Sequence, residues 1–141
     1  MLIIYSSNPN FKPIELDVKC ELGEYVLMED EKLPEWAYWY ARGILHCRWA
    51  DIGKPEVEDV IGRGPRWAYH YAADVLKCRW ADIGKPEIED IIGRDPMWAH
   101  YYAVNILHCK WSDIGKQEIE DRINKDLNWN NIYNEIWGIE C

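Results

Sequence analysis

The sequence predicts an all-α fold, a short α-solenoid in which helical hairpins with a 31-residue repeat stack on one another. Two observations support this prediction: the chain repeats itself with a period of 31 residues from Trp36 onward, and the apolar residues within each period have the spacing of amphipathic helices. The chain has 141 residues, of which 48% are hydrophobic and 29% are charged. This composition suits one folded domain and excludes an intrinsically disordered chain.

Residues 1–35 do not follow the period, and we expect them to form a small N-terminal cap. Leu2–Tyr5 could form one strand, residues 8–13 contain turn formers, and residues 21–32 could pair with the first helix of the repeats. The first residues lack the basic region of a secretory signal peptide. The apolar runs are also far shorter than the ~18 residues of a membrane span. We therefore expect a cytoplasmic protein that does not contact a membrane.

Three repeats and a final helix follow the cap. The repeats span residues 36–66, 67–97 and 98–128, and the first two share 22 of 31 residues. A fourth unit begins at Trp129 and is long enough for only one helix. Asn and Glu replace several apolar residues in it, as is typical of the terminal unit of a repeat array. We predict that residues 129–141 form a C-terminal capping helix and that the whole chain is a single domain.

Each repeat is predicted to contain two helices. The first runs for about 14 residues, and Pro65 and Pro96 stand at its start in the second and third units. Gly53 and Pro55 separate it from a shorter second helix in the first unit, which should bury Val57, Val60 and Ile61. The first helix should bury one apolar stripe, which in the first unit consists of Trp36, Ala37, Tyr40, Ala41, Ile44 and Cys47.

Three of the five cysteines, Cys47, Cys78 and Cys109, occupy one repeated position. Neighbouring helix axes lie about 8–10 Å apart, which exceeds the Cα separation of roughly 4.4–6.8 Å in a disulfide. Residues 31 positions apart in the sequence also lack the clustering of zinc ligands. We interpret these cysteines as small packing residues and predict no metal site.

The run WAYWYARGILHCRW from Trp36 to Trp49 and its two copies carry a resemblance to known repeats. The run is similar to short helical repeats with a WAYxYAxxVxxxRW pattern from bacteriophage and large-virus genomes. This resemblance covers about three-quarters of the chain. It implies a tetratricopeptide-like array of α-hairpins, a viral origin and action on a host factor, and it implies no catalytic residues. The chain departs from those repeats in its repeated cysteine, where they often have glycine, and in its longer Asp-Ile-Gly-Lys-Pro loop.

One face of the first helix differs among the three units, and we call it the variable face. It lies opposite the apolar stripe and contains Trp, Tyr, Arg and His, residue types that are enriched or common at binding hot spots. The alternative is a solvent face that drifted freely, but such a face usually accumulates Lys and Glu. We predict that the variable face binds a protein. It consists of Tyr38, Trp39, Arg42, His46, Tyr69, His70, Asp74, Lys77, His100, Tyr101, Asn105 and His108.

The net charge of −9 argues against direct binding to nucleic acid, because that affinity comes largely from Lys and Arg. The three repeats carry net charges of +1, −2 and −1, whereas residues 1–35 carry −5. We therefore expect an acidic patch in the cap. The second helices, each with a Glu-x-Glu-Asp run, are expected to form an outer acidic ridge whose charges Arg48, Lys54 and Arg63 can pair. The acidic patch consists of Glu21, Glu24, Glu29, Asp30 and Glu31.

The sequence does not predict an enzyme. His46–Cys47 and His108–Cys109 are the pairs that most resemble a base and a nucleophile, but adjacent helical residues point in different directions. The Gly-Lys-Pro segments lack the frame of a phosphate-binding loop. We predict no catalytic residues and no cofactor.

The leading functional hypothesis is a non-enzymatic protein-binding module. Given the resemblance, it would be a phage product in the host cytoplasm that inhibits a host enzyme or a defence complex, as anti-CRISPR proteins do. A homodimer is also possible. One alternative is an acidic mimic that occupies a DNA-binding or RNA-binding groove. The second alternative is a small-ligand binder with a pocket between the aromatic-rich helices.

Overall fold

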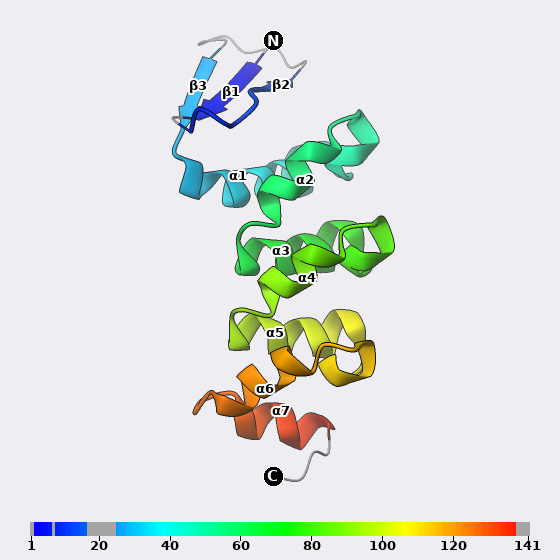
Figure 1. Cartoon of the computed structure of the whole chain (residues 1–141). Coiled ribbons are helices and arrows are strands. Elements are labelled where there is room, and N and C mark those ends of the chain that lie inside the picture. Colours follow the sequence, from blue (N-terminus) through cyan, green and yellow to red (C-terminus); the bar gives the residue numbers. More distant parts are fainter. Residues whose placement is uncertain (1, 7, 17–24, 138–141) are drawn as a thin grey trace.

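The computed structural model describes residues 2–6, 8–16 and 25–137. The molecule is mostly helical, with a small sheet at its N-terminal end. Figure 1 shows the helices following one another from this sheet to the C-terminal end in the order of the sequence. Within the described ranges, no helix combines the length and the apolar character needed to cross a membrane.

The sheet contains β1 (Leu2–Ser6), β2 (Ile14–Leu16) and β3 (Tyr25–Met28) in the order β2-β1-β3. β1 pairs with β2 antiparallel, with Ile4 opposite Ile14, and with β3 parallel. The mostly helical chain and the strand expected at Leu2–Tyr5 are thus confirmed, but the cap contains two further strands that were not predicted. Ile14 and Leu16 are buried on either side of exposed Glu15, and this alternation is the period of a strand.

The segment from residue 21 to 32 was expected to pair with the first helix, but its described part has another structure. Residues 21–24 lie outside the described residues. The remainder forms β3 and a short 3-10 helix, Asp30–Lys32, which leads directly into the first α-helix. Its acidic residues therefore stand beside the start of that helix.

Seven α-helices lie within the described residues, and four of them begin at a proline. Helices α2, α3, α4 and α5 begin at Pro55, Pro65, Pro86 and Pro96, because a proline lacks the N–H that would be unpaired at a helix start. Helix α1 contacts α3, and α3 contacts α5, so the first helices of successive units lie side by side. The helices are α1 (Leu33–Tyr40), α2 (Pro55–Ile61), α3 (Pro65–Tyr71), α4 (Pro86–Ile92), α5 (Pro96–Tyr102), α6 (Gln117–Lys125) and α7 (Asn130–Trp137).

Helices α1, α3 and α5 each continue as a π-helical turn, at Ala41–Leu45, Ala72–Leu76 and Ala103–Leu107. A π turn bonds residue i to i+5 instead of i+4, so the residues after it shift around the helix. Ile44, predicted to be buried, is 61% exposed, whereas its neighbour Leu45 and its equivalents Val75 and Ile106 in the later π turns pack against the core.

A tryptophan opens the 3-10 helix that follows each π turn, and it is completely buried. These residues are Trp49, Trp80 and Trp111, in the turns Trp49–Ile52, Trp80–Ile83 and Trp111–Ile114. The indole N–H of Trp49 donates to the carbonyl of Ala37 at 2.9 Å, and the other two make the equivalent bond. Each tryptophan thereby closes its own hairpin.

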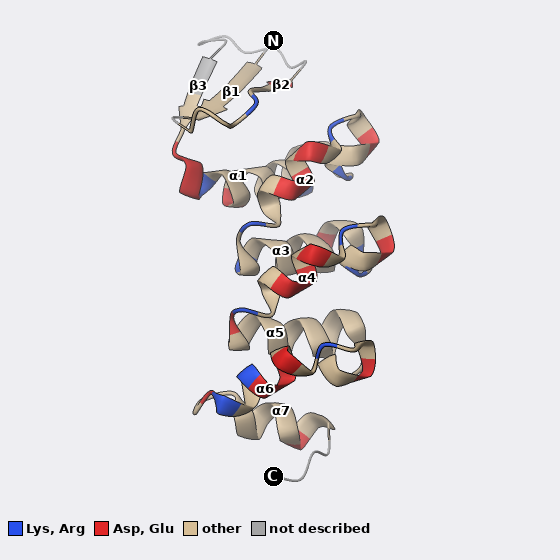
Figure 2. Cartoon of the chain, in the orientation of Figure 1, with Lys and Arg blue, Asp and Glu red and all other residues tan. Residues whose placement is uncertain are grey.

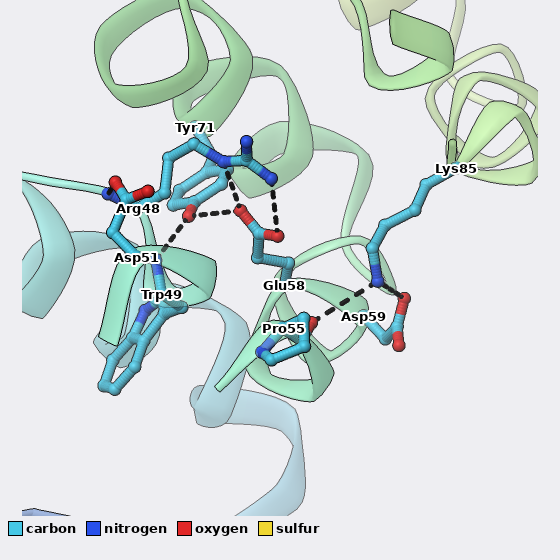
Figure 3. Close-up of polar contacts among 8 residues, drawn as sticks. All are labelled: Arg48, Trp49, Asp51, Pro55, Glu58, Asp59, Tyr71 and Lys85. Carbon is cyan, nitrogen blue, oxygen red and sulfur yellow. Dashed lines mark hydrogen bonds and ion pairs between the residues drawn. The ribbon is translucent and has the colours of Figure 1, made fainter. Parts of the chain in front are cut away.

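A tyrosine hydroxyl joins each hairpin to the one before it. Figure 3 shows the Tyr71 hydroxyl between the backbone N–H of Trp49, from which it accepts at 3.1 Å, and the carboxylate of Glu58, to which it donates at 2.8 Å. Tyr102 binds Trp80 and Glu89 in the same way. Tyr133 repeats the contact with Trp111 and Glu120. Burial raises the pKa of these three tyrosines far above the ordinary value, so each hydroxyl keeps the proton that it donates.

The glutamates in this contact are buried, so the prediction that the second helices form an outer acidic ridge was wrong for these residues. Glu58 and Glu89 have no exposed surface and Glu120 is 5% exposed, so the middle acid of each Glu-x-Glu-Asp run points inward. Arg48 donates two hydrogen bonds to Glu58, at 3.1 Å each, which compensate the buried charge. These bonds to the Glu58 carboxylate raise the pKa of Arg48.

The second and third units differ in this compensation. Arg79 forms the same two bonds with Glu89, at 3.0 and 2.9 Å. Lys110 occupies the equivalent position in the third unit, and no ion pair with Glu120 is present among the described residues. The charge pair is therefore complete in the first two units.

Close packing at the ends of the second helices requires glycine. A Cβ on Gly62 would lie 2.5 Å from Cδ1 of Ile88, and one on Gly93 would lie 2.4 Å from Cδ1 of Ile119. In the third unit, Asn124 in α6 occupies the position equivalent to these two glycines. The glycines are therefore a requirement of stacking one unit on the next.

Tyr102→Phe should destabilise the chain by about 1–3 kcal/mol, because it leaves the buried N–H of Trp80 without a partner and removes a bond to Glu89. Urea unfolding followed by circular dichroism measures the effect. The control is Tyr101→Phe, which removes a hydroxyl from the exposed neighbour and should stay within roughly 0.5 kcal/mol of the original chain. Equal effects of the two substitutions would contradict the role of the Tyr102 hydroxyl.

Candidate functional site

The structure divides the predicted variable face into exposed and buried residues. Tyr38 and His100 are only 2% and 3% exposed, and therefore do not belong to a free surface. Tyr69 and His70 are half-buried. The exposed members are Trp39, Arg42, His46, Asp74, Lys77, Tyr101, Asn105 and His108.

Tyr38 and His100 are buried because their rings pack against the next unit. The ring centroids of Tyr38 and Trp67 are 5.6 Å apart, and those of His100 and Trp129 are 5.3 Å apart. Tyr69 makes the equivalent contact with Trp98 at 5.5 Å. Variation at this position therefore changes the ring that stacks and leaves the stacking itself in place.

Hydrogen bonds across the units account for a second variable position. The Tyr38 hydroxyl donates to the carboxylate of Asp74, while Asn105 donates to the Tyr69 hydroxyl at 2.8 Å. Burial and the neighbouring Asp74 raise the pKa of Tyr38 to about 12. Asp74 and Asn105 thus differ from each other but both bind the tyrosine of the preceding unit.

An aromatic and cationic groove lies on the exposed part of the face, between the first and second units. We call it the Arg-Trp groove. The guanidinium carbon of Arg42 lies 5.5 Å from the ring centroid of Trp39, which is 49% exposed. Burial is the main cause that lowers the pKa of His70, so this imidazole is neutral near pH 7. The groove is lined by Tyr38, Trp39, Arg42, Arg66, Trp67, His70 and Asp74.

Two further grooves are equivalent to each other and lie at the ends of the π turns. One is lined by Arg42, His46, Cys47, Asp74 and Lys77 together with small apolar residues. The other, of about 390 Å³, is lined by Tyr69, Ala73, Lys77, Cys78, Asn105, Ile106 and His108. Both are open to solvent at the surface, and both carry basic or imidazole side chains.

The residue after each π turn has a left-handed backbone conformation. His46, Lys77 and His108 have φ values of 53°, 55° and 55°. Helices usually end in this conformation with glycine, because other residues pay a steric cost of about 1–2 kcal/mol. All three side chains are exposed, so burial does not explain why the chain has no glycine there.

The repeated cysteines lie beside these residues as half-buried free thiols. Burial raises the pKa of Cys78 and of Cys109, which lowers their content of reactive thiolate. Within the part of the chain that is described, no three His, Cys, Asp or Glu side chains are grouped so that they could hold a metal ion.

Part of the predicted acidic patch is paired with cations. Glu21 and Glu24 lie outside the described residues. The remaining acids, in red beside β3 and α1 in Figure 2, include Asp30, which binds Arg63 at 3.1 Å, and Glu29, which lies 3.7 Å from Lys32. Glu31 is exposed.

Acids on the second helices are also paired across units. Asp59 binds Lys85, and Asp90 binds Lys116. Figure 3 shows Lys85 reaching both Asp59 and the carbonyl of Pro55. Lys54, which was expected to pair with an acid, has no ion pair within the described ranges.

Comparisons with family models, with curated proteins and with solved structures found no match to this chain. The site is therefore defined by its own geometry. Two residues of the Arg-Trp groove were not predicted as part of the variable face: Trp67, which was assigned to the core, and Arg66, which precedes it. A signal was present, since Met97 and Asn128 stand at the equivalent positions.

Lys77→Gly should leave the free energy of unfolding unchanged or raise it by up to about 1 kcal/mol, because glycine adopts positive φ without a Cβ clash. Urea denaturation measures the change. Ala73→Gly, which places glycine inside the same π turn, is the control and should destabilise by roughly 0.5–1 kcal/mol. A loss above that range for Lys77→Gly would indicate a structural role for the lysine side chain.

Proposed function

We propose that the chain is a short α-solenoid of 31-residue helical hairpins and that it functions as a non-enzymatic protein-binding module. The recurrence of the tyrosine, tryptophan and glutamate contacts at 31-residue intervals supports the solenoid. The exposed part of the variable face supplies the binding surface. In stacked helical hairpins, an extended surface of this kind is commonly the one that binds partners.

The observation that carries this proposal is the exposure of aromatic and basic side chains on the variable face. Trp39 and Tyr101 are 49% and 36% exposed on α1 and α5, and Arg42 lies against Trp39. Tryptophan, tyrosine and arginine are the residues that most often dominate binding energy at protein interfaces. Large apolar side chains left in water also cost free energy that a partner would recover.

The half-buried thiols support a non-enzymatic function. A nucleophilic cysteine needs a lowered pKa, whereas burial raises the pKa of Cys78 and Cys109. No hydrogen bond between a cysteine and a histidine occurs among the described residues. The open form of the grooves also favours a protein ligand over a small molecule, because small-ligand sites are usually enclosed.

The resemblance to viral repeats suggests a host protein as the partner, such as an enzyme or a defence complex that the binding would inhibit. Mimicry of a nucleic acid has less support. It needs a continuous array of free acids, whereas Glu58 and Glu89 are buried and Asp59, Asp90 and Asp30 have cationic partners.

Affinity capture from bacterial lysate should retain a partner with the original chain and lose it with Trp39→Ala combined with Tyr101→Ala. The reason is that the pair removes the two exposed aromatic rings of the variable face. The matched control is Glu56→Ala combined with Glu87→Ala, on the exposed side of α2 and α4. Quantitative mass spectrometry measures the partner in each eluate.

The control variant should retain the partner at the original level. Loss with the control and retention with the aromatic pair would contradict the proposal and favour acidic mimicry. Circular dichroism of each variant verifies that the helices are intact.

A further inference from the structure

The Arg-Trp groove holds two guanidinium groups that the stacking of the units does not require. Arg42 lies 5.5 Å from the ring centroid of Trp39, and Arg66 lies 4.7 Å from that of Trp67. The two indole rings are 6.4 Å apart and belong to successive units. Each cation therefore lies against an aromatic ring, and the two rings meet in one groove.

The junction between the second and third units provides an internal comparison. Ala73 and Met97 occupy the positions equivalent to Arg42 and Arg66, and Asn105 stands in place of Asp74. The tyrosine of this junction nevertheless packs on the next tryptophan at 5.5 Å, as in the first junction at 5.6 Å. Neutral residues are therefore compatible with this packing, and the two arginines add charge at one junction alone.

Neither arginine has an anionic partner among the described residues. All of the ion pairs there use other cations, whereas the Asp74 carboxylate accepts a hydrogen bond from Tyr38. Arg42 makes one long hydrogen bond, of 3.4 Å, to the Tyr38 hydroxyl. In a chain with a net charge of −9, this groove thus presents two exposed guanidinium groups with free donors.

We propose that the Arg-Trp groove binds an acidic peptide segment of the protein partner. Carboxylates of that segment would pair with Arg42 and Arg66, whose planar groups suit bidentate contacts, and an apolar side chain would pack on Trp39. This inference rests on the proposed function, since it specifies the chemistry of the partner at the same face. The rings hold both cations in place, which reduces the entropy lost on binding.

Charge complementarity favours a peptide over a nucleic acid. Nucleic-acid affinity depends on several phosphate contacts along a basic surface, whereas this groove offers two arginines. The exposed acids of the second helices, red on α2 and α4 in Figure 2, would also repel a long phosphate backbone. A short acidic segment can engage the groove without crossing them.

Fluorescence anisotropy with a short fluorescein-labelled peptide of Glu and Leu tests the proposal. The original chain should bind the peptide, and Arg42→Ala combined with Arg66→Met should weaken that binding about tenfold or more. Both new residues already occupy the equivalent positions of the second unit, so the variant is expected to fold. Its urea midpoint verifies this.

The control removes the same net charge outside the groove, with Arg94→Ala combined with Lys125→Ala. Both side chains are exposed. This control should retain peptide binding within about twofold, because exposed distant charges are screened by salt. Equal weakening by the two variants would overturn the proposal, since it would indicate a general charge effect.

Absence of peptide binding to the original chain would also overturn it, as would tighter binding of a single-stranded oligonucleotide that the groove variant loses. Neither of these two results would overturn the proposed binding module, which partner capture tests separately. Partner capture that depends on Trp39 and Tyr101 would still support the binding module, whereas its failure would leave the peptide result unaffected.

Discussion

The carboxylate of Glu89 lies in the core without exposed surface, and its charge is accommodated because Arg79 and the Tyr102 hydroxyl bind both of its oxygens. The same hydroxyl accepts a hydrogen bond from the backbone N–H of Trp80. The Tyr102 side chain thus binds two buried polar groups of the preceding unit, this N–H and the Glu89 carboxylate. A buried charge without partners is strongly destabilising. Each hairpin therefore depends on the tyrosine of the next one, and the order of the stack follows from this dependence.

This constraint separates the residues that build the stack from those that remain for binding. Tyr38 looks variable in sequence, yet it packs on Trp67 and binds Asp74. Arg42 and Arg66 occupy positions where the next junction has alanine and methionine. The binding surface that we propose therefore consists of exposed side chains that the stacking contacts do not require. Its side chains are aromatic and cationic, in a chain that is acidic overall.

The sequence allowed the helical segments and their proline starts to be predicted because the repeats display the same pattern three times. It did not allow the inward direction of Glu58 to be predicted, since the compensating groups lie 10 and 13 residues away and a Glu-x-Glu-Asp run resembles a solvent face. The exposure of Ile44 was missed because the repeated pattern gives it the same apolar position as Val75 and Ile106, which do pack against the core. The strand at Leu2–Tyr5 was predicted and corresponds to β1, whereas β2 and β3 were missed because they are only three and four residues long. Eight of the twelve residues of the variable face were correctly placed on the surface, while Tyr38 and His100 are buried by contacts with the following unit.

Native-state hydrogen exchange of the Trp49 and Trp80 backbone amides tests the central coupling most directly, because both N–H groups donate to a tyrosine of the following unit. If the units depend on one another, the two amides should exchange with the same free energy, equal to that of global unfolding, and respond equally to added urea. Exchange of the two amides at different and lower free energies would mean that the hairpins open separately, and it would contradict the account.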